Sequence, residues 1–287
     1  MRELTVGLIG RGDALDSLAH AARYRPGIRL AGRVDPGAPL PDADRLICAG
    51  SSSSERAAVV ALALAAGRRI AMPPLLALDD EARRALASGS IVQVSPLVGY
   101  APLREVAQRV RRGEIGRPYG LFALHHLPRD AAADLDARLA DLLHYVLEVL
   151  ESPVVRVYAR RSALFGEQDD TWHAILHLAD ETLVTLEVAA CLPAGWPEPE
   201  RLLVEVTGSD AVLRAEPTRQ AVHATKRDGS TRAVPWWPDP SAGYLEAALA
   251  RLEQTDPPSE LRYLEVLSAL LSAATEQQAV RLADTGA

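Results

Sequence analysis

The first 35 residues have the pattern of a strand, a glycine turn, a helix and a second strand. LTVGLI (4–9) is a short apolar run that ends in Gly10-Arg11-Gly12, and a helical stretch follows from about residue 14 to residue 24. IRLAGRVD (28–35) then predicts a second strand that ends at Asp35. A helix between two strands is typical of parallel pairing, in which helices cover the sheet. The start of the chain therefore predicts an α/β domain of Rossmann type.

The same alternation continues to about residue 119. Two of the predicted helices are followed by Gly67 and Gly113, and glycine suits the left-handed conformation that ends many helices. The predicted elements are a strand at 43–50, a helix at 55–67, a strand at 70–72, a helix at 79–89, a strand at 91–98 and a helix at 102–112. We therefore predict a doubly wound parallel sheet in an N-terminal domain, residues 1–119.

After about residue 120 the pattern changes to strands joined by short turns, which favours antiparallel pairing. A helix at 134–150 interrupts the strands, a helix at 259–276 follows them, and the stretch 235–243 is the most loop-like part of the chain. The sequence thus predicts a second domain of the α+β class, residues 120–287, with a mostly antiparallel sheet. Its predicted strands are 120–127, 154–162, 171–179, 181–191, 201–209 and 210–216.

Composition and charge limit the partners. The chain has 287 residues, 48% of them apolar, which is enough for ordinary buried cores. A net charge of −7 argues against nucleic acid and acidic membranes, because phosphate binding relies on a surplus of Lys and Arg. Cys48 and Cys191 lack metal-ligand spacing, and no apolar run reaches the roughly 18 residues of a membrane span. We expect a cytoplasmic protein that binds a small molecule.

The glycine turn is the candidate cofactor site. A Rossmann loop needs one glycine to turn off the strand, a second to let a pyrophosphate approach the backbone, and a third for close helix packing. Gly10 and Gly12 flank Arg11 and meet the first two demands, whereas Leu15 occupies the third place. Asp35 is placed to accept hydrogen bonds from an adenosine ribose, which favours NAD over NADP. The alternative is a βαβ unit that keeps its glycines for the turn alone and binds no cofactor.

Several longer phrases resemble a known family over nearly the whole chain. They are PGIRLAGRVDPG, ALALAAGRRIAMPPLLALDDEARRAL, RRGEIGRPYGL, DLLHYVLEVL with SPVVRVYAR, and DDTWHAILHLADETLVTLEV. They are similar to the glucose-fructose oxidoreductase, inositol dehydrogenase and rhizopine-catabolism group, the Gfo/Idh/MocA family. The resemblance implies a Rossmann domain, a C-terminal open-faced sheet, and NAD(P)-dependent oxidation or reduction of a sugar, cyclitol or similar compound.

The chain departs from that family at the catalytic lysine. The resemblance implies a Glu-Lys-Pro tripeptide at the end of the strand at 70–72, with a lysine that hydrogen-bonds the reacting oxygen. Pro73, Pro74 and Leu75 stand there instead, and a shift of one residue supplies no lysine. Lys226, the only lysine in the chain, falls in a predicted turn and is expected to be a solvated charge. The usual hydride-transfer chemistry therefore needs another group at the oxygen.

The resemblance also places His144 on the family's helix histidine, which serves in acid/base work near the substrate carbon. The companion aspartates are replaced by Ala140 and Leu147, although Asp141 and Glu148 lie one position away. A shift of one residue rotates a side chain by about 100° around a helix, so we expect neither acid simply to replace the lost one. The alternative is a histidine packed at a domain interface.

Three further residues complete the candidate site. Tyr100 falls where the family carries a residue beside the pocket, so it is expected to donate a hydrogen bond to the substrate or to cap the cleft. Ser51 and Ser52 precede a predicted helix. Ser52 with Glu55 fits a capping box, and the alternative is that the serines hold an anionic group at the helix N-terminus.

The histidines of the second domain do not predict a metal site. His125 and His126 point to opposite faces of their strand, whereas His173 and His177 share one face. No carboxylate or thiol stands at a recognisable ligand spacing, so no metal is expected. The family's open sheet face commonly pairs with another subunit, which implies a homodimer or homotetramer formed through this sheet, with Trp172 or its alternate neighbours in the contact.

Three functions remain open on the sequence. The first is an NAD(P)-dependent oxidoreductase with a rearranged site, in which His144 or Tyr100 supplies the proton. The second is a redox-neutral lyase, cyclase or epimerase that reuses the cleft with His144 as acid/base and without a cofactor. The third is a non-catalytic partner or ligand sensor.

Overall fold

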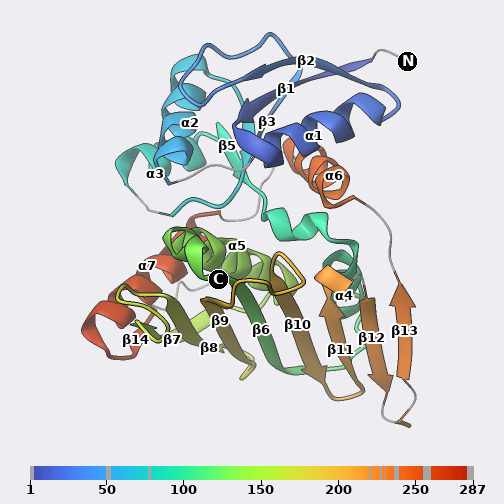
Figure 1. The fold of residues 1–287 in the computed structure, drawn as a ribbon, viewed down its shortest axis with the longest axis vertical. Coiled ribbons are helices and arrows are strands. Elements are labelled where there is room, and N and C mark those ends of the chain that lie inside the picture. The colour runs from blue at the N-terminus through green and yellow to red at the C-terminus, as the bar shows by residue number, and fades with distance from the viewer. Residues whose placement is uncertain are drawn as a thin grey trace. The chain divides into compact units, whose positions relative to one another are not determined.

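The computed structural model describes residues 3–49, 53–76, 79–219, 221–226, 228–229, 231–235, 239–254 and 260–282. The chain forms two compact units (Figure 1). The first contains Met1–Tyr100 and Pro238–Leu264, and the second contains Ala101–Trp237 and Glu265–Ala287. None of the helices in the described part of the chain combines the length and hydropathy that a bilayer span requires.

The first unit is built on the predicted parallel sheet. Its strand order is β2-β1-β3-β4-β5, and every neighbouring pair is parallel. Because the chain leaves β1 toward β2 on one side and reaches β3 on the other, the order reverses at β1 and β3, where doubly wound folds bind ligands. The strands are β1 (Leu4–Gly10), β2 (Ile28–Val34), β3 (Arg45–Ala49), β4 (Ile70–Met72) and β5 (Ile91–Gln93).

Helices and a short 3-10 turn complete this unit. The predicted helices at 14–24, 55–67 and 79–89 are confirmed as α1 (Gly12–Tyr24), α2 (Ser53–Ala66) and α3 (Asp80–Ala87). The strand predicted over 91–98 is shorter, because Pro96 begins a 3-10 turn, η1 (Pro96–Gly99), which the Ser95 side chain caps at Leu97 N.

A helix that the sequence did not predict belongs to the first unit as well. α6 (Pro240–Glu253) begins inside the stretch expected to be a loop. Asp239 caps it by accepting a hydrogen bond from Ser241 N at 2.9 Å, and a proline at the first helical position suits a helix start. Tyr244 and Leu245 lie in the core of the first unit. The compact units therefore interleave along the chain, whereas the ranges 1–119 and 120–287 are consecutive.

The second unit contains a nine-stranded sheet in the order β13-β12-β11-β10-β6-β9-β8-β7-β14. It is mostly antiparallel as predicted, and the β6–β9 pair is parallel. Its strands are β6 (Pro118–Pro128), β7 (Val154–Ser162), β8 (Thr171–Leu178), β9 (Leu183–Leu192), β10 (Arg201–Gly208), β11 (Ala211–Glu216), β12 (Ala221–Lys226), β13 (Thr231–Pro235) and β14 (Val280–Arg281). The helices are α4 (Ala101–Arg111) and α5 (Leu135–Val149), with short turns η2 (Arg129–Asp134) and η3 (Pro217–Arg219); α7 (Glu260–Glu276) spans the boundary between the units.

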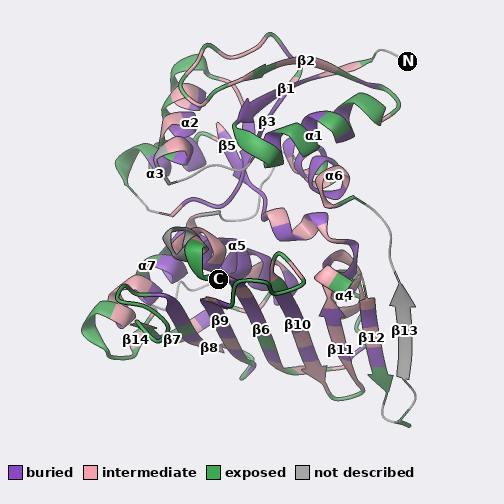
Figure 2. Ribbon diagram, viewed as in Figure 1, coloured by how far each residue is buried: buried purple, intermediate pink, exposed green. Residues whose placement is uncertain are grey.

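Buried and less buried residues alternate along several strands of this sheet (Figure 2), so its two faces differ in burial. α5 packs against β6, β8 and β9, and along β8 the residues on this covered face, among them Trp172, are buried. His173 and His177 lie on the opposite face, which is only partly covered. Trp172 is therefore buried inside its own chain, and the neighbours that alternate with it line the open face.

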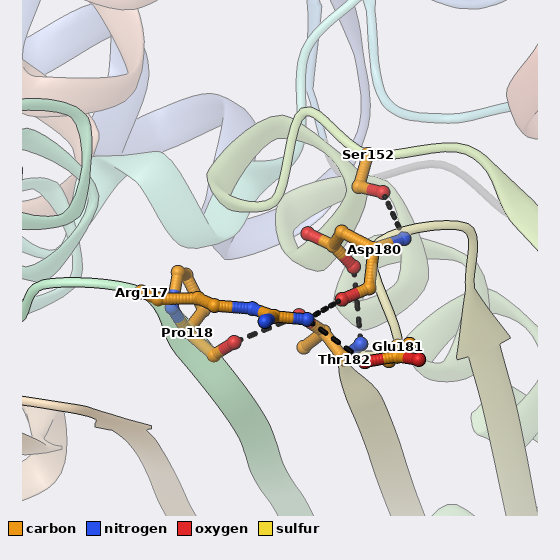
Figure 3. Close-up of polar contacts among 6 residues, drawn as sticks. All are labelled: Arg117, Pro118, Ser152, Asp180, Glu181 and Thr182. Carbon is orange, nitrogen blue, oxygen red and sulfur yellow. Dashed lines mark hydrogen bonds and ion pairs between the residues drawn. The ribbon is translucent and has the colours of Figure 1, made fainter.

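The phrase GEIGRP is explained by contacts around the start of β6. Arg117 donates hydrogen bonds to Asp180 O and to Glu181 Oε2, each at 2.9 Å, in the turn between β8 and β9 (Figure 3). Thr182 Oγ1 donates to Pro118 O at 3.2 Å. These bonds join the starts of β6 and β9, which must lie together because the two strands are parallel. Two of the phrases that carry the family resemblance thus meet for a structural reason.

Gly116 in the same phrase lies against the turn between β10 and β11. Its φ is +69°, and a Cβ atom there would lie 2.0 Å from Ser209 Oγ. That hydroxyl accepts a hydrogen bond from Arg117 N at 3.1 Å, so the side chain is already held in place. No residue other than glycine fits without displacing it.

Gly116→Ala should therefore lower the free energy of unfolding more than Gly113→Ala. Both glycines have a positive φ, +69° and +71°, but a Cβ at Gly113 would meet nothing within 4 Å. Each variant loses about 1–2 kcal/mol to backbone strain, and displacement of Ser209 should add about 1 kcal/mol at Gly116. Urea denaturation measures the difference, and equal losses would contradict the packing role of Gly116.

Asp170, in the phrase DDTW, organises the loop before β8. Its carboxylate accepts hydrogen bonds from Leu164 N at 2.9 Å, Phe165 N at 2.6 Å and Thr171 Oγ1 at 2.9 Å. Burial alone would raise the pKa of the Asp170 carboxyl, but these hydrogen bonds outweigh it and hold the pKa below its ordinary value of 3.8.

When folding lowers the pKa of a carboxyl group, its ionised form stabilises the folded protein at any pH above the unfolded-state pKa. This stability is lost as the pH falls toward and through the lower, folded-state pKa. The free energy of unfolding of the wild type should therefore fall more between about pH 5 and pH 2 than that of Asp170→Asn, which is already less stable at the higher pH. Asp169→Asn, next in the chain and half exposed, is the control and should keep the acid-induced loss. Chemical denaturation across this pH range tests the prediction, which is wrong if Asp170→Asn and the wild type follow parallel curves.

Candidate functional site

The glycine turn connects β1 to α1, as the sequence predicts. Gly10 has φ +147°, and a Cβ there would lie 2.2 Å from Ala49 O at the end of β3. Gly12 has φ +69°, with open space around its missing side chain. Arg11 is the N-cap residue of α1 and makes no side-chain cap hydrogen bond. Leu15, at the third glycine place, is buried in the core. Gly10 thus permits close strand packing, and Gly12 leaves room above the helix N-terminus.

Charged side chains surround this turn. Arg11 Nη2 lies 3.1 Å from Asp35 Oδ2, and Arg11 Nη1 lies 3.9 Å from Glu55 Oε1 in the first turn of α2. Asp13 lies in the first turn of α1. The structure therefore brings Arg11 and Asp35 together from the ends of β1 and β2. Three carboxylates and one guanidinium give this cluster a net charge of −2.

The backbone of the turn fits a dinucleotide. A helix N-terminus presents unpaired N–H groups and a partial positive charge, and the space at Gly12 lets a pyrophosphate approach them. Asp13 opposes such an anion, because its carboxylate lies at the same helix end. Ser51 and Ser52, predicted to serve the same group, lie outside the described residues.

The end of β4, where the resemblance implies a lysine, is buried and held by backbone contacts. Leu75 N donates to Gln93 Oε1 at 2.6 Å, and Tyr263 Oη donates to Leu75 O at 2.9 Å. Arg56 Nη1 donates to the carbonyl oxygen of Pro74. Pro74 has no titratable group, but it has a permanently charged guanidinium beside it.

Sequence reasoning missed Arg56. Only 4% of its surface is exposed, although arginine is rarely buried unless it is paired. One signal was present, since Arg56 is the only cation in the helix SSERAAVVALALAA and every residue that follows it there is apolar. A charged residue on an apolar helix that begins at the carboxyl edge of a parallel sheet indicates a role at that edge.

His144 lies on α5 in the second unit and is buried, 3% exposed. Its Nδ1 atom lies 3.8 Å from Glu148 Oε2, one helical turn later. Glu148 lies this close because residues four apart share a helix face; that neither neighbouring acid takes over the role of the lost one stays a prediction. Asp141 is also buried, and its Oδ2 atom lies 4.0 Å from Arg138 Nη1. Burial raises the pKa of the adjacent Tyr145 phenol, which donates to Leu103 O at 2.9 Å.

Tyr100 is half-buried and follows η1 in the first unit. Its backbone N–H donates to Leu97 O at 3.1 Å and closes the 3-10 turn. Tyr100 and the glycine turn thus belong to the first unit, and His144 to the second.

Three histidines of the second sheet approach carboxylates from other parts of the chain. His125 Nε2 lies 2.7 Å from Glu200 Oε2 on the covered face of the sheet, and His126 Nε2 lies 2.6 Å from Glu187 Oε1 on the open face. His173 approaches Glu187 as well, at 3.6 Å. The hydrogen bond from His126 lowers the pKa of the Glu187 carboxyl. Across the described ranges, no group of three or more His, Cys, Asp or Glu residues could hold a metal ion.

Two comparisons of the sequence find no match. No protein-family model matches it, and no curated protein has a significantly similar sequence.

Solved structures share the fold along its whole length. An oxidoreductase from Agrobacterium radiobacter, solved with NAD+, L-tartaric acid and magnesium, has a TM-score of 0.78 and 15% identity, over 97% of this chain and 98% of that one. GenD2 from gentamicin A biosynthesis, solved with NAD, has a TM-score of 0.74 and 16% identity, over 98% and 97%. A Sinorhizobium meliloti protein named as a candidate myo-inositol dehydrogenase has a TM-score of 0.75 and 17% identity, over 98% and 100%. The chain therefore shares its fold with an NAD-bound oxidoreductase and with NAD-bound GenD2.

Arg56→Met should lower the free energy of unfolding by about 1–3 kcal/mol, because it removes a buried donor from Pro74 O. Arg83→Met, on the exposed side of α3, removes the same charge from the surface and should cost less than about 0.5 kcal/mol. Thermal or urea denaturation compares the two variants. If Arg56→Met costs no more than Arg83→Met, Arg56 does not fix the end of β4.

Proposed function

We propose that the protein is an NAD-dependent oxidoreductase of the Gfo/Idh/MocA type that acts on a sugar, a cyclitol or another small biosynthetic intermediate. The observation that carries this proposal is the glycine turn. Gly12 leaves open space at the N-terminus of α1, and Asp35 lies beside it at the end of β2. The same fold in an oxidoreductase and in GenD2, both solved with NAD, supports it.

In this proposal the cofactor is held by the first unit. Backbone N–H groups after Gly10 and Gly12 bind the pyrophosphate, and Asp35 accepts hydrogen bonds from the adenosine ribose. Ser51 and Ser52 are proposed to assist at the N-terminus of α2. The bound nicotinamide supplies or accepts the hydride. Asp35 favours NAD, because its carboxylate repels a 2′-phosphate.

The lost lysine leaves two tasks, which we assign to different residues. The first is to stabilise negative charge on the reacting oxygen, and Arg56 offers a fixed positive charge beside Pro74. Arginine stays protonated and cannot supply a proton, so the second task needs another group. His144 is proposed to take or give that proton, and Glu148 at 3.8 Å stabilises the imidazolium that forms. Tyr100 is proposed to hydrogen-bond the substrate.

We further propose that the protein is cytoplasmic and forms a homodimer or homotetramer through its second sheet. The open face supports this idea, since Phe122, Tyr158 and Leu183 remain 37–42% exposed there. A partner subunit would cover them.

NADH binding tests the function. At about 100 times Kd, NADH adds about 2.7 kcal/mol to stability, which should raise Tm by roughly 5 °C or more. Gly12→Ala should weaken NADH binding at least about tenfold, because the new methyl group occupies the pyrophosphate's space. Gly27→Ala is the matched control: its φ is +80° with the same open surroundings, but Gly27 lies at the other end of α1.

An absent NADH shift in the wild type would overturn the proposal. The prolines after β4 favour a second candidate in that case, a redox-neutral lyase, cyclase or epimerase that uses His144 alone. Turnover by protein stripped of nucleotide would support it. Saturable ligand binding without turnover would instead indicate a sensor or a non-catalytic partner.

A further inference from the structure

The guanidinium of Arg11 lies where the adenosine end of the cofactor would bind. Arg11 comes from the glycine turn itself, and its Nη2 atom contacts Asp35 Oδ2 at 3.1 Å. Both side chains are open to solvent, 59% and 63% exposed, so a ligand can reach both. The acid expected to select NAD is thus already paired with a cation. This inference rests on the proposed function.

The pair leaves both partners able to bind a ligand. The contact is made through Oδ2 of Asp35, and among the described residues no other side-chain partner of Asp35 is seen, so Oδ1 can accept a ribose hydroxyl. Arg11 has five N–H donors and can offer some of them to a phosphate while it keeps its contact with Asp35. The pair therefore has an acceptor for a 2′-hydroxyl and a donor set for a 2′-phosphate, side by side.

The surrounding charges decide which ligand is favoured. Asp13 and Glu55 add negative charge near Arg11, and Glu55 is itself 3.9 Å from Arg11 Nη1. A 2′-phosphate is therefore disfavoured as long as Asp35 is ionised. Without Asp35, the guanidinium loses its closest counter-ion and becomes available to the phosphate.

We propose that Arg11 determines how strongly the protein discriminates between NAD and NADP. Asp35 accepts the 2′-hydroxyl of NAD, and Arg11 receives the 2′-phosphate of NADP, so that removal of the acid alone shifts the preference toward NADP. Asp35 alone does not set the preference between NAD and NADP, because its effect depends on the guanidinium of Arg11 with which it is paired.

Affinity measurements on four proteins test this proposal: the wild type, Asp35→Asn, Arg11→Gln and the double variant. Kd for NADH and for NADPH is measured by titration calorimetry at low and at high salt. The wild type should prefer NADH. Asp35→Asn should tighten NADPH binding about tenfold. Arg11→Gln should weaken NADPH binding about tenfold, with a change in NADH affinity below about threefold. In the double variant the tighter NADPH binding seen in Asp35→Asn should disappear.

Arg23→Gln is the control, since it removes an exposed arginine from the last turn of the same helix, α1. It should leave the NADH/NADPH ratio unchanged. The proposal is overturned if Arg11→Gln changes both affinities equally, or if Asp35→Asn tightens NADPH binding equally with and without Arg11. Those results would leave the proposed function intact. If neither the wild type nor Asp35→Asn binds either nucleotide, the proposed function itself fails, and this inference fails with it.

Discussion

The close approach of β1 and β3 at Gly10 constrains everything else in the candidate site. A Cβ at Gly10 would lie 2.2 Å from Ala49 O, so the two backbones can meet only if this residue has no side chain. Their meeting creates the point where the strand order reverses. The turn that follows must place Arg11 and Gly12 at that point, next to Asp35 from the adjacent strand. One steric requirement in the sheet thus positions the charged groups around the glycine turn.

The end of β4 is an ordered segment whose position is fixed without a titratable side chain at Pro73 to Leu75. Gln93, Tyr263 and Arg56 hold the backbone at Pro74 and Leu75 by hydrogen bonds, so the prolines lie in an ordered, buried segment. A positive charge lies beside this segment, because Arg56 on α2 donates a hydrogen bond to Pro74 O. A cation that reaches the edge from a helix can stabilise an oxyanion, but arginine leaves proton transfer to other residues.

Much of the fold follows from local pattern in the sequence, and the site follows less completely. The strand–glycine–helix order predicted the parallel sheet, because alternation and turn residues act over a few positions. α6 was missed because its apolar face is explained only by a sheet some 200 residues earlier in the chain, where Tyr244 Oη donates to Cys48 O. Arg11–Asp35 and His126–Glu187 depend on which strands become neighbours. Glu148 is different, since its spacing of four from His144 is visible in the sequence and places both side chains on one helix face.

The return of the chain to the first unit has a consequence for biosynthesis. A ribosome releases the five parallel strands long before it makes Pro240–Glu253, and until then the sheet lacks the helix that supplies Leu245 and Leu249 to its core. The nascent Rossmann unit must wait, with apolar surface uncovered, while strands β6 to β13 of the second sheet are translated. The first unit therefore becomes complete only after α6 has been made.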